Sequence, residues 1–575
     1  MFTRIMRSGR TPGKYVGILP VAMTLFCGNL YGQSAIDAMR LAQPDMKGTA
    51  RYMSMGGAFG ALGGDLTTLS VNPAGIGVYR NHEVGVTVDL DAISTSSMSS
   101  EGKFSATRTP FLLNNIGGVL TLKLNSSVVP NLNFGFTYNR TASFNNKYGG
   151  SLGSLSTSMT NWMAGIANGE NVTESSVQYS SNFNPYNPND GYGAPWMTIL
   201  GYQSFFITPM GDPENPRWEG QFTSASSDYP ATTGIGYYNV EEKGGIDSFN
   251  IAFGGNFGNL VYWGMDFDIS NLNYTRNTLY GENLDNARVL SDQGMESTTS
   301  DWNLKNWYNI SGTGFTYKLG VILRPIQELR LGVAFHTPTY YTLTQEFSAK
   351  TEAYYNGEST PLIRYSNADK NGYWEPGYND LRFVSPWKVM VSAAGVLANK
   401  LIISADYQWD LTSKMHFKDP SYYGGYYDYP YGDYFSQYIN SYDSDGTNQA
   451  INNYYSDIRT LRIGAEYRVI KNFSVRAGYS NVSSGVRQNA SSGNEIIFTA
   501  GTMPDYSFKN ATNYYTCGLG WRTGGFYADL AYVHKNYSSV YHAFSGDPEA
   551  AIQASPTAKV NFKSNQIVMS LGYKF

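Results

Sequence analysis

Apolar and polar residues alternate one by one along much of this chain. Between residues 261 and 269, Trp263, Met265 and Phe267 share one face of an extended strand, and Asp266 and Asp268 share the other. A period of two predicts β-strands whose two faces meet different surroundings. The same pattern recurs at 84–90, 132–138, 249–253, 329–335, 403–409, 461–469 and 567–575.

The chemistry of the two faces favours a membrane β-barrel. The apolar faces are long and end in aromatic residues, whereas the opposite faces carry glycines and full charges such as Asp406 and Arg462. A soluble β-sandwich also alternates, but its apolar face points inward. Apolar side chains toward lipid and polar side chains toward a lumen give the pattern seen here.

The spacing of these strands predicts their number and connections. About fourteen strand candidates are present, and an even number is typical of bacterial barrels. Short turns alternate with long connections, as expected for turns at one end of a barrel and loops at the other. We predict a 14-stranded antiparallel transmembrane β-barrel over residues 82–575. The short turns are 125–130, 255–259, 324–328, 398–400, 470–472 and 523–525; the long connections are 149–245, 282–302, 349–380, 414–456 and 484–509.

Two of the long connections stand out. The first is a large insert at about 150–245, which contains a predicted helix at 156–167. The second, at about 414–456, is dense in tyrosine, glycine and aspartate, a composition typical of an exposed loop.

Composition agrees with a barrel and excludes other classes. Charged residues are 15% and aromatic residues 15% of 575, whereas soluble proteins have about 25% charged residues. Many aromatic residues and few charges argue against a disordered chain. The mean hydropathy of −0.34 is too low for a bundle of membrane helices. A net charge of −4 gives no basic excess, so we expect no nucleic-acid partner.

The first residues predict export. Arg4, Arg7 and Arg10 precede an apolar run at 16–27, and small or polar residues then lead to Gly32. About a dozen apolar residues are too few to cross a hydrocarbon core of about 30 Å as a helix, which disfavours a membrane anchor. We predict a signal peptide over residues 1–32, removed before Gln33, and a multi-pass location in the outer membrane of a Gram-negative bacterium.

Residues 33–81, between this signal and the first strand, contain glycine pairs and an Asn-Pro turn. The segment Met53-x-Met55-Gly56-Gly57-Ala58-Phe59, followed by Asp65 and by Asn72-Pro73-Ala74-Gly75, resembles the N-terminal hatch of the FadL/TodX (OMPP1) family of outer-membrane transporters. The resemblance continues through 385–387, 461–464, 475–478 and the last strand, and it suggests a Bacteroidetes-type member. The hatch motif residues are Gly56, Gly57, Asn72, Pro73 and Ala74.

The resemblance implies a mechanism. In the family, a hatch plugs a 14-stranded barrel, ligand passes from external loops to a pocket between hatch and wall, and it leaves beside a kinked third strand. The matching strand here is 132–147, and its distal part has no glycine or proline to mark a kink. We predict that Met53, Met55, Phe59 and Leu62 line the ligand pocket, because methionine adapts to ligands of varied shape; a plain hatch core is the alternative.

Eight charged residues fall on predicted inward faces. We expect them to form a lumen charge network between wall and hatch, with a role in selectivity as the alternative. They are Asp266, Asp268, Asp406, Arg462, Glu466, Arg468, Arg476 and Asp529. Tyr573 and Phe575 close the last apolar face, and an aromatic final residue resembles the signal read by the barrel assembly machinery.

Other chemistry has weak support. Residues 149–153 match G-x-S-x-G, but that nucleophile elbow needs an α/β sheet that this chain does not predict. The five histidines show no zinc-binding spacing; His336 is expected to face the lumen as a hydrogen-bonded residue, with a metal or haem ligand as the alternative. We therefore expect no enzyme, no metal and no cofactor.

The function predicted from the sequence is passive uptake of hydrophobic small molecules, either long-chain fatty acids or aromatic hydrocarbons. The expected partners are this ligand, outer-membrane lipid and lipopolysaccharide, and the barrel assembly machinery. The alternative is a FadL-like barrel that binds protein cargo as a secretion-system shuttle or surface platform, because tyrosine-rich loops are good protein-binding surfaces.

Overall fold

The computed structural model describes residues 34–43, 45–99, 102–180, 182–187, 194–291, 294–398, 400–418, 444–491, 497, 501–546 and 552–575. The predicted signal peptide and residues 419–443 of the tyrosine-rich loop lie outside these ranges. Within them, no helix is both long and apolar enough to span a membrane.

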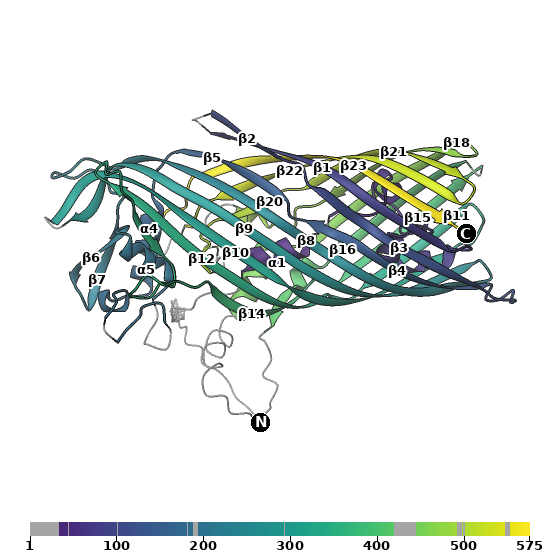
Figure 1. The fold of residues 1–575 in the computed structure, drawn as a ribbon, viewed down its shortest axis with the longest axis horizontal. Helices are drawn as coiled ribbons and strands as arrows, with labels where there is room; N and C mark the ends of the chain where they lie inside the picture. Colours follow the sequence, from purple (N-terminus) through teal and green to yellow (C-terminus); the bar gives the residue numbers. More distant parts are fainter. Residues whose placement is uncertain are drawn as a thin grey trace, which may run out of the picture.

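The strands form one closed antiparallel barrel of fourteen strands, which confirms the predicted fold class (Figure 1). Closure joins the first strand to the last, from the pair Glu83–Lys574 to the pair Ser97–Val560. Six strands are interrupted into two segments, namely β2/β3, β4/β5, β11/β12, β14/β15, β16/β17 and β20/β21. The segments of the wall are β1 (Glu83–Ser99), β2 (Gly102–Arg108), β3 (Phe111–Lys123), β4 (Asn131–Ser143), β5 (Asn146–Ser154), β8 (Thr233–Phe257), β9 (Val261–Ser291), β10 (Gly294–Leu323), β11 (Leu329–His336), β12 (Tyr340–Tyr355), β14 (Gly377–Val384), β15 (Lys388–Leu397), β16 (Leu401–Asp410), β17 (His416–Lys418), β18 (Ile458–Ile470), β19 (Phe473–Val482), β20 (Tyr506–Lys509), β21 (Thr512–Thr523), β22 (Phe526–His542) and β23 (Thr557–Lys574); β13 (Leu362–Tyr365) pairs with β12 beside it.

The two faces of the wall differ as the alternation predicts. Apolar side chains such as Phe136, Ile251 and Phe267 are exposed on the outside, whereas Asp266 and Asp268 of the same region are buried inside. This outer apolar belt is typical of a surface that faces lipid. The short turns lie at the end of the barrel that carries Phe575, and the long connections lie at the other, outer end (Figure 1).

One predicted loop is strand instead. Residues 282–302 are expected to be a long connection, but β9 continues to Ser291 and β10 begins at Gly294. The alternation persists there with buried Tyr280, Leu284 and Trp302 on the inner face. The outer face becomes polar because the strands have left the apolar belt. An alternation of apolar and polar residues therefore does not predict these strand ends.

The hatch lies inside the barrel. It contains α1 (Ala35–Ala42), α2 (Ala50–Ser54), α3 (Thr68–Val71) and the 3-10 helix η1 (Pro73–Val78). Ser34 and Thr49 cap α1 and α2 with their side chains, as N-cap residues do. Asn72 caps η1 by accepting from the backbone N–H of Ala74, with Pro73 in the first turn. Gly56 and Gly57 adopt φ of 63° and 77°, which is the left-handed region that glycine tolerates best.

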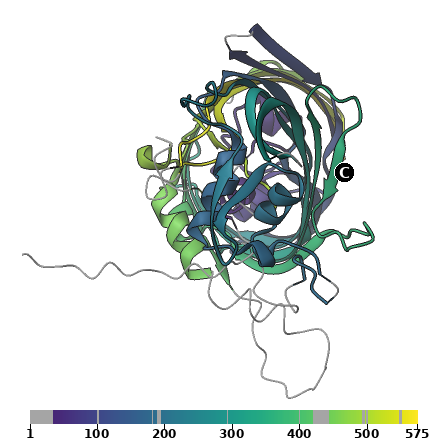
Figure 2. The ribbon, with the colours of Figure 1, turned by 90° about the vertical axis from the view of Figure 1, so that its left-hand side faces the viewer.

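The insert between β5 and β8 covers residues 155–232, a shorter span than predicted because both flanking strands extend into it. It contains α4 (Met159–Gly169), η2 (Glu174–Ser176), α5 (Trp196–Gln203) and the hairpin of β6 (Ile207–Asp212) with β7 (Asn215–Gly220). Figure 2 shows these elements within the outer mouth of the barrel. The other helices in the described ranges are η4 (Thr412–Lys414), α7 (Ser444–Tyr454) and α8 (Gln488–Ser491).

Candidate ligand site between hatch and wall

Inward glycines let the hatch backbone lie directly against the wall. A Cβ added to Gly264 would lie 2.1 Å from the carbonyl oxygen of Pro73, and one added to Gly478 would lie 2.2 Å from the carbonyl carbon of Met55. Gly464 meets the carbonyl oxygen of Met55 in the same way, and Gly320 meets the side-chain oxygen of Asn72. Such distances leave no room for a side chain. The alternation predicts these glycines to face inward but does not reveal what they contact.

Ion pairs then fix the hatch to the inner wall. The Nζ of Lys47 lies 2.7 Å from Asp89 and 3.3 Å from Asp91, both on β1. Arg51 of α2 lies 2.9 Å from Glu466 on β18. These groups are largely buried, and a buried charge is tolerated only when it is paired. The hatch is therefore held by charges on two separate strands of the wall.

Seven of the eight predicted network residues are buried on the inner face, although their partners were not all foreseen. Arg476 lies 2.7 Å from Glu466 and 2.6 Å from Asp529, both predicted members. Asp266 and Asp268 instead pair with Lys318, at 3.3 and 2.6 Å. The carboxylate of Asp406 accepts from the N–H of Gly60, and Arg462 donates to Gln408.

Arg468 departs from the prediction, because it is exposed near the short-turn end of β18. The regular register shifts there between Arg468 and Ile470, so strict alternation no longer assigns a face. His336 does face the lumen and contacts the carbonyl oxygen of Val71 at 2.9 Å. In the described ranges, no group of three His, Cys, Asp or Glu residues could hold a metal ion.

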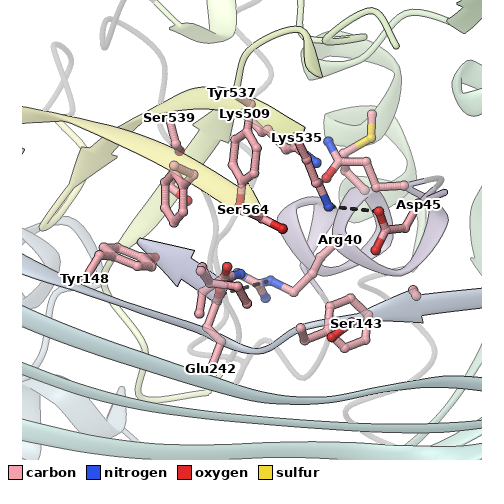
Figure 3. Close-up of a pocket in the computed structure, with 18 of the residues that line it drawn as sticks. Arg40, Asp45, Ser143, Tyr148, Glu242, Lys509, Lys535, Tyr537, Ser539 and Ser564 are labelled. Atoms are coloured by element: carbon pink, nitrogen blue, oxygen red, sulfur yellow. Dashed lines mark hydrogen bonds and ion pairs between the residues drawn. The ribbon is translucent and has the colours of Figure 1, made fainter. Parts of the chain in front are cut away.

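A cavity of about 140 Å³, here called the hatch cavity, lies between α1 and the inner wall (Figure 3). Its apolar lining includes Ile36 and Met39 from α1, Phe144 at the β4/β5 junction and Phe562 from β23. Its polar lining comes from the hatch and from the wall, and includes Arg40, Asp45, Glu242, Lys509 and Lys535. The cavity is thus amphipathic, with room for a ligand that has a polar end.

The cations of the hatch cavity are not equivalent. Lys535 is paired with Asp45 at 2.8 Å, and Arg40 is paired with Asp37. Lys509 instead lies over the ring of Tyr537, at 4.4 Å from its centroid. Burial, reinforced by the neighbouring Lys535, lowers the pKa of Lys509 to about 7. Lys509 is therefore the cation in this cavity whose charge a negatively charged ligand would stabilise most.

A second cavity of about 170 Å³ adjoins the first and shares Gln43, Asp45 and Ala142 with it. It is lined mainly by polar residues, including Lys318, His336 and Arg462. Ala142 is 5% exposed and borders both cavities, so a larger side chain there would intrude on both.

The four predicted pocket residues lie elsewhere. Met53, Met55 and Phe59 are fully buried and Leu62 is nearly so, all within one apolar core. None of them is among the residues that line either cavity. The structure therefore favours the alternative, in which these side chains form the hatch core. The cavity residues escape sequence analysis because Lys509 and Glu242 fall in segments expected to be loops.

The third strand is interrupted beside the hatch cavity. The ladder between β3 and β4 ends at Asn115–Asn139, and the register of β4 against β8 shifts between Arg140 and Ala142. The strand is then interrupted between β4 and β5. There the backbone N–H of Phe144 donates to the carbonyl of Gly244, a residue with φ of 112°. The third strand has no glycine or proline of its own at 138–142 to mark this irregularity. Gly244 on the neighbouring strand β8 accommodates it instead.

Beyond this break, β5 has only one backbone partner. Its ladder runs to β8, and in the described part of the chain no ladder joins it to β1 or β2. Side chains close the gap: the hydroxyls of Thr95 and Ser97 donate to the carbonyls of Lys147 and Gly149. We call this line between β1 and β5 the seam.

Comparisons with known proteins give similarity to solved structures only. No family model matches the chain, and no curated protein does. A FadL homologue from Pseudomonas aeruginosa aligns with a TM-score of 0.47 and 12% identity over 92% of this chain and 99% of that one. The toluene transporter TodX of Pseudomonas putida aligns with a TM-score of 0.43 and 12% identity over 92% of this chain and 99% of that one. The toluene transporter TbuX of Ralstonia pickettii aligns with a TM-score of 0.38 and 14% identity over 95% of this chain and 99% of that one.

Proposed function

We propose that this protein is an outer-membrane channel of the FadL/TodX type for passive uptake of hydrophobic small molecules. The ligands would be long-chain fatty acids or aromatic hydrocarbons. The observation that carries the proposal is an amphipathic cavity between hatch and wall that directly borders the seam.

The lining of the hatch cavity connects these features. Asp91 and Ile93 of β1 border it from one side of the seam, and Ala142, Phe144 and Tyr148 border it from the other. Only side chains bridge the seam, so it can open without breaking a backbone ladder. This arrangement supports a route from the cavity to the outside of the wall, despite the absence of glycine or proline at 138–142 of the third strand.

The test fills the cavity from one small residue. Ala142→Phe would place a ring in the space shared by the two cavities, whereas Ala405→Phe adds the same ring on the exposed outer face of β16. We expect uptake of labelled oleate or toluene to fall in Ala142→Phe and to be unchanged in Ala405→Phe, at matched surface levels. Equal uptake by wild type, Ala142→Phe and cells lacking the protein would refute the proposal.

The protein-binding alternative stays a prediction, because most of the tyrosine-rich loop lies outside the described residues.

A further inference from the structure

Part of the wall is much taller than a membrane requires. A transmembrane strand needs about 9–11 residues, but β8, β9 and β10 have 25, 31 and 30 residues. Ile269 is the last apolar residue in the outer belt of β9. From there to Ser291, at about 3.3 Å per residue and a tilt of about 40°, the strand rises roughly 55 Å beyond the belt. Figure 1 shows these strands extending at the end opposite Phe575. Uptake of a hydrophobic ligand through the hatch cavity makes no use of this outer surface.

A groove of about 790 Å³ lies on the outer face of this tall wall. Residues of β8, β9, β10 and β12 form its floor, β2 forms one rim, and β13 with the loop that follows it forms the other. Asn277 on the floor is eight residues beyond Ile269 along β9, which places the groove roughly 20 Å above the belt. We call it the wall groove.

Aromatic rings line the wall groove although it faces water. Phe104 on one rim is 41% exposed, and Trp374 on the other is 42% exposed. Trp374 stacks on Tyr365 with centroids 5.2 Å apart and an angle of 5° between the rings, so its outer face is held open. Tyr237 and Trp307 add partly buried rings on the floor. Flat, exposed rings above the membrane suit a ligand with one flat apolar face.

The polar groups between the rings include amides, and the charged groups are held in ion pairs. Asn239 and Asn277 offer both donors and acceptors, as a hydroxyl-rich ligand requires. The charged residues of the lining pair with one another or with their neighbours: Lys305 and Lys350 lie 2.8 and 2.6 Å from Glu352, and Arg108 and Lys243 lie 3.2 and 3.0 Å from Glu241. Two cations share each carboxylate, so these pairs leave a small positive excess beside the groove.

Both rims are fixed to the rest of the protein. The Arg108–Glu241 pair joins β2 to β8. On the other side, the hydroxyl of Tyr179 in the insert donates to the carbonyl of Ala368 at 2.6 Å, beside Trp374. A groove whose walls are already ordered loses little conformational entropy on binding.

We propose that the wall groove binds a segment of the polysaccharide that surrounds the barrel at the cell surface. Pyranose rings stack their C–H faces on aromatic side chains, and their hydroxyls pair with amides. The source of the sugar, though not the chemistry of the groove, rests on the proposed outer-membrane location. Binding there would anchor the tall wall within the polysaccharide layer.

The test uses the full-length purified protein in an amine-oxide detergent, because sugar-based detergents would compete. The probe is the delipidated polysaccharide that mild acid releases from the lipopolysaccharide of the host strain. Its binding to the protein is measured by calorimetry. We expect saturable binding that weakens roughly tenfold in both Trp307→Ala and Trp374→Ala, since each removes a stacking ring. Trp521→Ala is the matched control, because this 48% exposed indole lies on the lipid-facing surface far from the groove.

No saturable binding by wild type, or equal binding by wild type and the Trp307→Ala/Trp374→Ala double variant, would overturn the inference. The double variant should keep wild-type uptake of labelled oleate or toluene, because it leaves the hatch cavity and the second cavity beside it intact. A wild-type protein that takes up ligand but binds no polysaccharide overturns this inference alone. One that does neither overturns the proposed function as well.

Discussion

At the scale of single residues, Glu282 controls how the insert begins. Its carboxylate accepts from the hydroxyl of Ser158, from the backbone N–H of Met159 at 2.8 Å and from the hydroxyl of Tyr280 at 2.6 Å. It is fully buried, at a level of β9 well outside the apolar belt. Burial raises the pKa of Glu282 to about 7 against the effect of these hydrogen bonds.

This shift predicts a pH-dependent insert. A folded-state pKa above the unfolded value means that the folded state binds more protons between about pH 4.5 and 7, so docking of the insert weakens as pH rises through that window. We expect the rate of limited proteolysis within 155–232 to increase from pH 5 to pH 7 in wild type. Glu282→Gln should flatten this profile, because it keeps the carbonyl acceptor and removes the titration. A variant with the wild-type profile would show that another group titrates.

The glycines under the hatch make a second prediction at this scale. Gly478→Ala should destabilise the protein by about 1–3 kcal/mol, because its Cβ would overlap the backbone of Met55 and force the hatch to shift. Gly395→Ala is the control, since a Cβ there meets nothing within 4 Å. The measurement is the midpoint of thermal unfolding in detergent. Equal midpoints for the two variants would mean that the hatch does not rest on this strand.

At the scale of elements, one face of β9 passes from lipid to water. Phe267 is 38% exposed within the apolar belt, and Asn273 is exposed on the same face six residues later. Phe267→Arg should cost about 2–4 kcal/mol if it lies near the bilayer midplane, whereas Asn273→Arg should cost close to nothing. Urea titration of refolding into phospholipid vesicles measures both. Similar costs would place the edge of the membrane elsewhere on β9.

The alternation of side chains was enough to predict the barrel, because a strand with lipid on one side and a lumen on the other must alternate. Phe136, Ile251 and Phe267 therefore face outward as expected, and the fourteen-strand fold is confirmed. Above the belt, the outer faces of β9 and β10 meet water instead of lipid, whereas buried residues such as Leu284 and Trp302 stay on the inner faces. The apolar outer face that marks a membrane strand is therefore missing there, and the sequence does not distinguish strand from loop.

The candidate site was less predictable for a different reason. Charges such as Glu466 and Arg476 could be placed on the inner face, but their distances depend on which strands become neighbours. The cation opposite Asp266 and Asp268 is Lys318, some fifty residues away on the adjacent strand β10. Lys509 reaches the hatch cavity from a segment expected to be a loop. Spacing along one strand carries no information about such contacts.

At the scale of the whole molecule, the insert acts as a lid on the outer mouth. Phe206 packs on Trp302 with ring centroids 4.6 Å apart, and Trp196 packs on Phe347 at 5.3 Å. Figure 2 shows the insert across the opening that a ligand from outside would meet first. Uptake through the mouth therefore requires this lid to move.

A reversible cross-link tests that requirement. The hydroxyl oxygens of Ser204 and Thr351 lie 2.7 Å apart, so cysteines at both positions should form a disulfide between the lid and β12. We expect oxidation of the double variant to stop uptake of labelled oleate and a reductant to restore it. The two single-cysteine variants, with Cys517→Ser in every background, provide the control. Wild-type uptake by the cross-linked protein would show that ligand reaches the hatch without passing the lid.

The closure of the barrel between β1 and β23 also sets an order of events during assembly. This pairing joins residues as far apart as Glu83 and Lys574, so its chain-entropy cost is the largest of any neighbouring strands. Lys47 of the hatch can meet Asp89 on β1 early, whereas Arg51 must wait for Glu466 on β18. In the finished barrel the lid covers the outer mouth, and the ion pairs of the hatch lie buried inside the wall. We therefore expect the hatch to travel with the first strands and to be enclosed as the last strand arrives.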